Sequence, residues 1–258
     1  MRTSVSDDGE YPALCARAAE DDGAFACFKR QNAYRRILEH PRVSMGWVYL
    51  THIVQEHSFL VPFLDRFREN DVLGDPATFD YGYYGRFSPT TLRYVEVLGQ
   101  LVDTFDVLTD MDIVEIGAGY GGQCFVIDRY CRFRSYTIVD LAPCLALAKR
   151  YLALHRVPAV RFWTAEDIPE KADGFDLAIS NFGFSECARA VQEFYAERVL
   201  DKSLCGYLTC NNVDPTLGAV SQKELSGLLP HASFSPERPL VRKGNYVVIW
   251  KPVRETRP

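Results

Sequence analysis

Three glycines in the run "IVEIGAGYGGQ", Ile113 to Gln123, are spaced for close contact between the backbone and a ligand. Gly117, Gly119 and Gly121 fit E-x-G-x-G-x-G, and the same run also fits G-x-G-x-x-G. An apolar run precedes this loop and a helical pattern follows it, so the glycines lie where a ligand can approach the start of a helix. Asp140 ends the next apolar run, where a carboxylate can accept hydrogen bonds from both hydroxyls of a ribose. The spacing predicts a nucleoside site; a plain tight turn and a helix-capping aspartate are the alternatives.

Glu115, two residues before the first of these glycines, indicates which kind of nucleoside ligand the site binds. A dinucleotide would place its pyrophosphate at the loop, where a carboxylate costs Coulomb energy. S-adenosylmethionine has no phosphate, and its ammonium and sulfonium charges suit an acidic neighbour. We therefore expect S-adenosyl-L-methionine as cofactor, with S-adenosyl-L-homocysteine as product, and we disfavour a dehydrogenase. A salt bridge unrelated to any ligand is the alternative role for Glu115.

The elements that position these residues follow from the hydrophobic pattern after residue 110. Strand-like apolar runs alternate with helical patterns, which indicates parallel strands with helices on both faces. The strand runs cover 111–117, 135–141, 159–165, 175–182 and 205–211, and the helical ones cover 121–131, 142–155 and 186–200. Two extended segments around the "KGN" of 243–245 predict a closing antiparallel hairpin. The expected fold is α/β, with a Rossmann-like, seven-stranded, mostly parallel sheet over 88–252 and a tail over 253–258.

The first 87 residues are mostly helical in pattern and predict an N-terminal helical cap that contributes to substrate binding. Helices are expected over 13–20, 24–40, 46–55 and 89–106, the last starting at a Ser-Pro pair that suits a helix N-terminus. A tyrosine-rich loop over 75–91 lies among them. Aromatic faces pack on sugar rings and arginine pairs with phosphate or carboxylate. Substrate-binding candidates are therefore Tyr81, Tyr83, Tyr84, Arg86 and Arg93, although the aromatic side chains equally suit packing of the cap on the sheet.

Composition excludes several classes of protein. A formal net charge of −5 gives no sign of a nucleic-acid partner. The polar, acidic N-terminus lacks the apolar core of a signal peptide, and no apolar run has the roughly 18–20 residues of a membrane span. The eight cysteines form no CxxC pair or zinc spacing, which is typical of a reducing cytoplasm. We expect a cytoplasmic protein; the sequence carries no signal for an oligomeric state.

The run "VEIGAGYGG", followed by "TIVDL" and "FDLAISNFGFSE", resembles the class I S-adenosylmethionine-dependent methyltransferases over about Met111 to Trp250. The closing hairpin agrees with the sixth and seventh strands of that family. The resemblance implies that Glu115 and Gly117 lie beside the methionine moiety and that Asp140 holds the ribose. It places Asp167 at the adenine amino group and Ser180–Asn181 near the sulfur and methyl. The implied cofactor site also includes Ala118, Gly119, Gly121, Leu141 and Glu166.

A narrower set of motifs is similar to the sugar O-methyltransferases of bacterial polysaccharide clusters. It comprises "EIGAGYGGQ", "YTIVDL", "FDLAISNFGFSEC", "YAERVL" and "GYLTCNN", with "NAYRRILEH" and "SPTTLRYV" upstream. The resemblance implies an enzyme of polysaccharide biosynthesis that methylates a hydroxyl of a sugar or similar small polar acceptor. A nucleotide-linked or lipid-linked sugar would fit. Acceptors with an amine, phosphate or carboxylate stay open, as does a non-catalytic nucleoside-binding protein.

A sugar hydroxyl is a weak acid, so its methylation calls for a general base. Glu186 is the first candidate because it follows the fourth strand at the ligand edge of a parallel sheet, although the first turn of a helix also favours glutamate. Asn211 and Asn212 follow the fifth strand at the same edge and are candidates for binding substrate hydroxyls. A turn at Asp214–Pro215 is the alternative for that segment.

No metal is expected at the reacting centre. The fourth strand ends in Ser180–Asn181 rather than in the aspartate typical of metal-dependent, catechol-type methyltransferases. His52 and His57 are five residues apart on a predicted helical segment, a spacing that does not place two ligands on one helix face. His155 is expected to end a helix as a C-terminal cap or surface residue.

Overall fold

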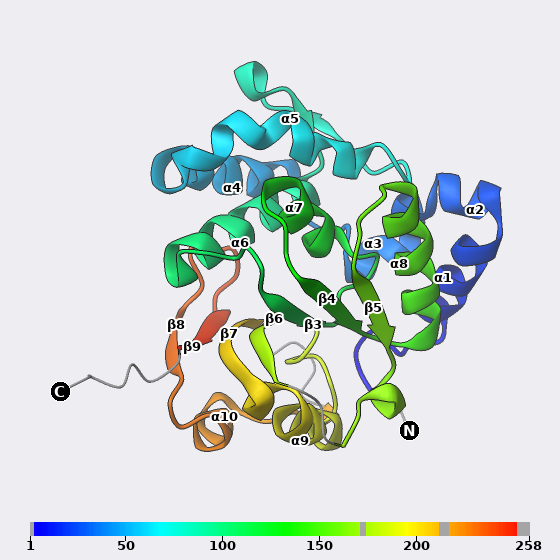
Figure 1. Cartoon of the computed structure of the whole chain (residues 1–258). Helices are drawn as coiled ribbons and strands as arrows, with labels where there is room; N and C mark the ends of the chain where they lie inside the picture. Colours follow the sequence, from blue (N-terminus) through cyan, green and yellow to red (C-terminus); the bar gives the residue numbers. More distant parts are fainter. Residues whose placement is uncertain (1–2, 171–173, 212–216, 252–258) are drawn as a thin grey trace.

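The computed structural model describes residues 3–170, 174–211 and 217–251. Its centre is a seven-stranded sheet with the order β5-β4-β3-β6-β7-β9-β8 (Figure 1). All neighbouring strands are parallel except at β9, which runs antiparallel between β7 and β8. The strands are β3 (Asp112–Ile116), β4 (Ser135–Val139), β5 (Val160–Trp163), β6 (Phe175–Asn181), β7 (Ser203–Cys210), β8 (Ser233–Pro236) and β9 (Tyr246–Trp250). The expected Rossmann-like sheet with a C-terminal antiparallel hairpin is confirmed.

Helices cover both faces of this sheet. One face carries α6 (Pro89–Phe105), α7 (Gly122–Tyr130) and α8 (Ala142–Leu154), and the other carries α9 (Arg189–Arg198) and α10 (Gln222–Leu228) (Figure 1). The chain passes from β5 to β6 through a short 3-10 turn, Ala165–Asp167, without a crossover helix, as the polar linker predicts. Helix α10 is missing from the predicted elements, although the capping box that Ser221 and Glu224 form is its signal.

The N-terminal region packs onto the face that carries α6, α7 and α8, and shares its core with the sheet. Its helices are α1 (Glu10–Glu20), α2 (Asp22–Ala26), α3 (Asn32–Ile37), α4 (Val43–Glu56) and α5 (Leu64–Phe67). The single helix predicted over 24–40 is wrong. The chain leaves helical geometry at Cys27 and again at Gln31, whose backbone is extended, and Phe28–Arg30 form a 3-10 turn between them. The domain boundary at residue 87 stays a prediction.

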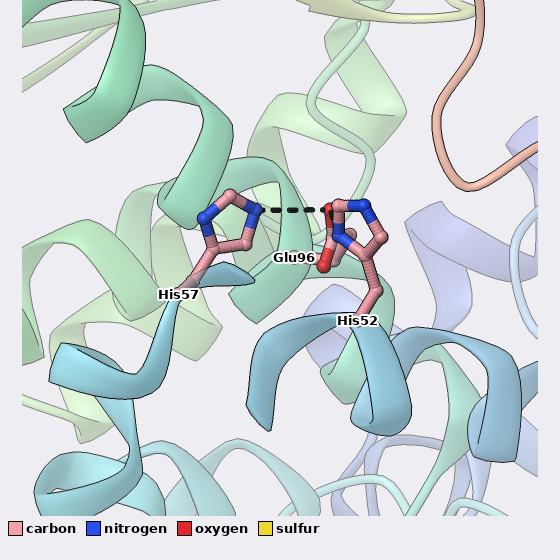
Figure 2. A group of neighbouring side chains, drawn as sticks. All are labelled: His52, His57 and Glu96. Atoms are coloured by element: carbon pink, nitrogen blue, oxygen red, sulfur yellow. Dashed lines mark hydrogen bonds and ion pairs between the residues drawn. The ribbon is translucent and has the colours of Figure 1, made fainter. Parts of the chain in front are cut away.

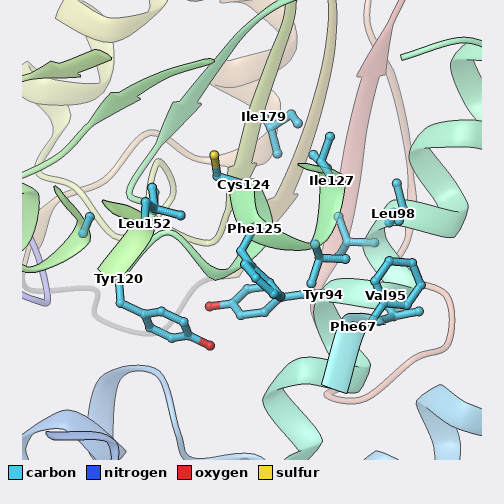
Figure 3. Packing of buried hydrophobic residues seen from close by; sticks show 14 of the residues in the cluster. Phe67, Tyr94, Val95, Leu98, Tyr120, Cys124, Phe125, Ile127, Leu152 and Ile179 are labelled. Carbon is cyan, nitrogen blue, oxygen red and sulfur yellow. The ribbon is translucent and has the colours of Figure 1, made fainter. Parts of the chain in front are cut away.

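Tyr120, inside the glycine loop, anchors that loop to the N-terminal region (Figure 3). Its hydroxyl accepts a hydrogen bond from Asn70 Nδ2 at 2.9 Å, and Asn70 Oδ1 accepts one from the Tyr151 hydroxyl at 2.9 Å. The Lys29 ammonium lies 4.1 Å from the centre of the Tyr120 ring and donates to Asn70 O at 2.7 Å. Burial lowers the pKa of Lys29 to about 8, while the charges of Glu39 and Asp71 raise it, and the ammonium lies against ring faces and one carbonyl. The position of the glycine loop therefore depends on side chains from the N-terminal region and from the region that contains the sheet.

Asn70→Ala should destabilise the protein by at least ~2 kcal/mol, because buried hydroxyls of Tyr120, Tyr151 and Thr91 would lose their amide partner. Urea denaturation measures this. The matched exposed change Asn32→Ala should stay within ~0.5 kcal/mol of the parent. Equal effects from the two substitutions would contradict the anchoring role of Asn70.

No helix among the described residues is both long and apolar enough to cross a bilayer.

Candidate active site

A cavity of about 560 Å³ lies at the carboxyl ends of the parallel strands. That is within the ~300–1,000 Å³ of small-molecule sites, and this edge of an open α/β sheet is where ligands bind. From the strand ends it is lined by Ile116, Gly117, Val139, Asp140, Asn181 and Asn211. From the N-terminal region and α6 it is lined by Tyr11, Leu38, His40, Arg42, Tyr49 and Arg93. One cavity therefore joins the glycine loop to the segments that follow β6 and β7.

A contact between two glycines fixes the loops that follow β3 and β6. Gly117 has a φ of 75°, and a Cβ there would lie 2.6 Å from the Cα of Gly183. A Cβ on Gly183 would likewise lie 2.7 Å from the Cα of Gly117. The Ser180 hydroxyl reinforces this approach, donating to Ile116 O at 2.8 Å and accepting from Phe184 N at 2.9 Å. Ser180 is fully buried and does not line the cavity, so it fastens the two loops, whereas its neighbour Asn181 lines the cavity.

Asp140 lines the cavity with both carboxylate oxygens oriented by the backbone. Oδ2 accepts from Gly119 N at 2.9 Å, and Oδ1 accepts from Leu141 N at 2.7 Å. Each oxygen keeps a lone pair for a further donor. Burial raises the pKa of Asp140 to about 6, even though both backbone hydrogen bonds lower it. Above that pH the side chain is an ionised acceptor placed beside Gly117, Gly119 and Leu141, which line the same cavity.

Glu115 differs from the prediction. Its side chain is 1 % exposed, lies outside the cavity lining and accepts a hydrogen bond from the Tyr136 hydroxyl at 2.8 Å. Side chains alternate along β3, so Glu115 points to the same face of the sheet as Ile113, into the core beneath α6, α7 and α8. Burial, with a smaller effect of the Asp140 charge, raises the pKa of Glu115 to about 8. Burial therefore favours the protonated carboxyl group, which weakens the argument that its charge would repel a pyrophosphate.

The other predicted cofactor residues separate into two groups. Leu141 and Asn181 line the cavity, whereas Ala118 is buried and Gly121 is the left-handed N-cap of α7. Glu166 and Asp167 are exposed and lie outside the lining. Asp167 accepts from Thr164 N and from its hydroxyl, both at 2.8 Å, in a capping box. These local hydrogen bonds engage Oδ2 of the carboxylate that is expected to bind adenine, and its contact with adenine stays a prediction.

Glu186 and Asn211 meet in the cavity, as their positions after β6 and β7 predict. Glu186 Oε1 accepts from Asn211 Nδ2 at 2.7 Å, and Asn211 Oδ1 accepts from the Ser185 hydroxyl at 3.2 Å. Burial raises the pKa of Glu186, while the hydrogen bond from Asn211 and the nearby arginines lower it. An oriented carboxylate with a raised pKa suits a general base. Asn212 and Asp214–Pro215 lie outside the described residues.

Arg93 brings a buried positive charge to the cavity. It is 6 % exposed, and its Nε has no hydrogen-bond partner. Within the described ranges no carboxylate lies at ion-pair distance from it, and its guanidinium lies 5.9 Å from the centre of the Phe182 ring. Burial, with the charges of Arg93 and Arg242, lowers the pKa of His40 to about 4. Arg42 and Arg242 line the same part of the cavity, together with Glu237, whose pKa the charge of Arg93 lowers.

The tyrosine-rich loop does not reach the cavity. It forms a small hairpin of β1 (Phe79–Asp80) and β2 (Arg86–Phe87). Tyr81 is buried against Trp47, whereas Tyr83 is 96 % exposed and has Tyr84 as its ring neighbour. Arg86 donates to Thr78 O at 2.9 Å on the surface. The substrate-binding prediction for Tyr81, Tyr83 and Arg86 is not met in this structure, since the aromatic residues serve packing or face solvent.

Residues 3–6 cover part of the cavity, a placement that no sequence pattern predicts. Val5 N donates to Glu186 O at 2.9 Å, and Ala188 N donates to Thr3 O at 2.8 Å. These two hydrogen bonds and a bridge from Ser4 to Cys187 attach the chain start to the segment after β6. The N-terminal segment therefore forms a wall beside Glu186.

Two histidines, His52 and His57, lie differently from their predicted places. Helix α4 ends at Glu56, so His57 is its C-cap, and its ring turns towards α6 to meet His52 at Glu96 (Figure 2). The spacing argument against a shared site assumed one continuous helix and is wrong for that reason. His155 is the C-cap of α8, as predicted, and its ring lies 4.4 Å from that of Phe125.

No family model matches the chain, and no curated protein matches it. Among solved structures the chain is similar to an rRNA methylase from Streptococcus thermophilus, with 15% identity, 60% of this chain and 96% of the other covered, and a TM-score of 0.46. It is similar to a SAM-dependent methyltransferase from Aquifex aeolicus (15% identity, 58% and 86% covered, TM-score 0.43). It is also similar to the YcgJ protein from Bacillus subtilis (19% identity, 54% and 68% covered, TM-score 0.42). None of these names indicates a sugar O-methyltransferase, so that narrower resemblance stays a prediction.

Proposed function

We propose that the protein is an S-adenosylmethionine-dependent methyltransferase that acts on a hydroxyl of a small polar molecule. One observation carries the proposal. A single cavity joins the glycine loop and Asp140 to an oriented, largely buried carboxylate, Glu186. A nucleoside cofactor at the glycine loop and Asp140 would lie in the same cavity as an acceptor at Glu186, as in-line transfer requires.

The strand order supports a methyltransferase over a dinucleotide enzyme. Counted from β3, the order is 3-2-1-4-5-7-6 with the seventh strand antiparallel. Classic dinucleotide-binding sheets have the order 3-2-1-4-5-6. This inserted strand belongs to the class I methyltransferases in the resemblance described above. The topology thus replaces the charge of Glu115 as the argument for S-adenosylmethionine.

Glu186 would act as the general base. S-adenosylmethionine supplies an activated methyl group, and the chain must orient the acceptor, exclude water and remove its proton. Asn211 holds the Glu186 carboxylate from one side, and the wall of residues 3–6 shields it from solvent. Its raised pKa brings its basicity closer to neutral pH, which favours proton transfer in the transition state.

The acceptor would carry an acidic group as well as the reacting hydroxyl. A buried guanidinium without an ion-pair partner is costly, and a ligand phosphate or carboxylate would offset that cost at Arg93. Sugars linked to a nucleotide or lipid phosphate, or bearing a carboxylate, meet this requirement. The protein would then act in polysaccharide biosynthesis. Two alternatives remain open. The enzyme could methylate a carboxylate, phosphate or amine of the acceptor, or the protein could bind a nucleoside without catalysis.

Calorimetry should show binding of S-adenosylmethionine and S-adenosylhomocysteine but not of NAD. Asp140→Ala should weaken cofactor binding by at least ~1–2 kcal/mol, since it removes charge-assisted hydrogen bonds. In the parent, affinity should fall as the pH drops through about 6, because protonation of Asp140 removes an acceptor. The exposed control Asp201→Ala should bind normally. Tight NAD binding, or an Asp140→Ala affinity equal to that of the parent, would refute the cofactor assignment.

Glu186→Gln should lower kcat by roughly 10²–10⁴-fold, the usual contribution of a general base, with cofactor affinity unchanged. Steady-state transfer of labelled methyl groups and calorimetry measure the two quantities. Glu193→Gln, an exposed change on α9, is the matched control and should keep full turnover. Turnover of Glu186→Gln at the control level would end the candidacy of Glu186 as base.

Sugars with a phosphate or carboxylate should accept labelled methyl groups far better than the corresponding neutral sugars. Arg93→Met should raise the KM of the acidic acceptor and leave cofactor affinity unchanged, because the guanidinium would pair with the acceptor alone. A panel of paired sugars with and without the acidic group measures this preference. If the neutral sugars were methylated as fast as the sugars with a phosphate or carboxylate, the proposal of an acidic acceptor would be wrong.

A further inference from the structure

Outside the cavity, two histidines and a glutamate converge where α4 meets α6 (Figure 2). His52 Nδ1 lies 2.9 Å and His57 Nε2 lies 3.3 Å from Glu96 Oε1. Glu96 and His57 are each 2 % exposed, and the His52 side chain is 25 % exposed. The cluster is therefore buried, with His52 at its open side.

The donor atoms have the spacing of a metal site. One nitrogen from each histidine and a carboxylate oxygen all lie within 4.8 Å of one another. A tetrahedral zinc ion with bonds of about 2.0–2.1 Å holds its donors about 3.3 Å apart. The two distances to Glu96 Oε1 are close to that value, so small movements of the side chains would bring the three donors around one ion.

A second carboxylate lies beside His57. Its Nδ1 is 2.9 Å from Asp103 Oδ2, at ion-pair distance but without hydrogen-bond geometry, on the side of the ring away from Glu96. Metal-binding histidines commonly donate their other ring N–H to a carboxylate, which leaves the opposite nitrogen free to bind the metal. Gly99 makes room for this orientation, because a Cβ there would lie 2.4 Å from the His57 ring. Residues outside the three donors, Asp103 and Gly99, therefore also shape the surroundings of the His57 ring.

Hydrogen bonding within the described residues leaves part of Glu96 unsatisfied. His52, His57 and the Gln100 amide, at 2.9 Å, all approach Oε1. Oε2 is buried and has no hydrogen-bond partner among the described residues. An unsatisfied oxygen on a buried carboxylate is costly, and a bound cation accounts for it.

We propose that His52, His57 and Glu96 bind one divalent transition-metal ion. Two imidazoles and a carboxylate, with a fourth position open to water, match zinc best. The ion would fasten α4 to α6. The same two helices carry Tyr49 and Arg93, which line the cavity, so the metal would stabilise one wall of the acceptor site from outside. The proposal does not depend on the identity of the cofactor.

Zinc binding to the full chain, purified without a polyhistidine tag, tests the proposal by calorimetry and thermal unfolding. The parent should bind one zinc ion per chain with a rise in Tm. His52→Ala, at the open side of the cluster, should fold normally and lose both effects. Asp103→Asn should weaken zinc binding by ~10–100-fold, the usual effect of losing an outer carboxylate. The exposed control His231→Ala should behave as the parent.

Cobalt substitution identifies the ligands, because the eight free cysteines are the competing donors. Visible ligand-field bands without thiolate charge-transfer bands support the His–His–Glu site. Thiolate bands would overturn the proposal. So would a parent protein that binds no zinc, or a His52→Ala variant that binds zinc as tightly as the parent and gains the same Tm.

Discussion

The close approach of Gly117 and Gly183 is the constraint on which the rest of the site depends. Neither position has room for a Cβ, so the loops after β3 and β6 touch through their backbones. The buried hydroxyl of Ser180 bonds both segments and holds that contact. As a result the glycine loop with Asp140 and the segment leading to Glu186 open into the same cavity. In the proposed reaction, this contact sets the distance between cofactor and base.

Burial determines the charge of the cavity. It raises the pKa of Asp140 to about 6 and also raises that of Glu186, which makes both carboxylates weaker acids than exposed ones. Arg93 lies near Glu186 and has no ion-pair partner in the described part of the chain, and His40 stays neutral at physiological pH. Low polarity strengthens each remaining electrostatic interaction. The cavity is therefore suited to a ligand that brings hydroxyls to one part and an acidic group to another.

The fold was predictable because strand and helix periodicities are local properties of the sequence, and the strand-end rule correctly brought Asp140, Asn181, Glu186 and Asn211 to one edge. The direction in which a side chain points was harder to predict from the sequence. Glu115 follows the alternation of β3 into the core, and Tyr81 packs where tertiary contacts, not composition, decide. The wall of residues 3–6 depends on contacts between segments distant in the sequence, and the meeting of His52 with His57 depends on where helix α4 ends. Such features follow from packing and have no local pattern.

A crystal structure of the complex with S-adenosylhomocysteine and an acidic sugar tests whether one cavity holds both cofactor and acceptor. The ribose hydroxyls should donate to Asp140, and the sulfur should lie near Asn181. The acceptor hydroxyl should contact Glu186 while its acidic group pairs with Arg93. A nucleoside bound away from Asp140, or an acceptor hydroxyl out of reach of Glu186, would contradict this arrangement.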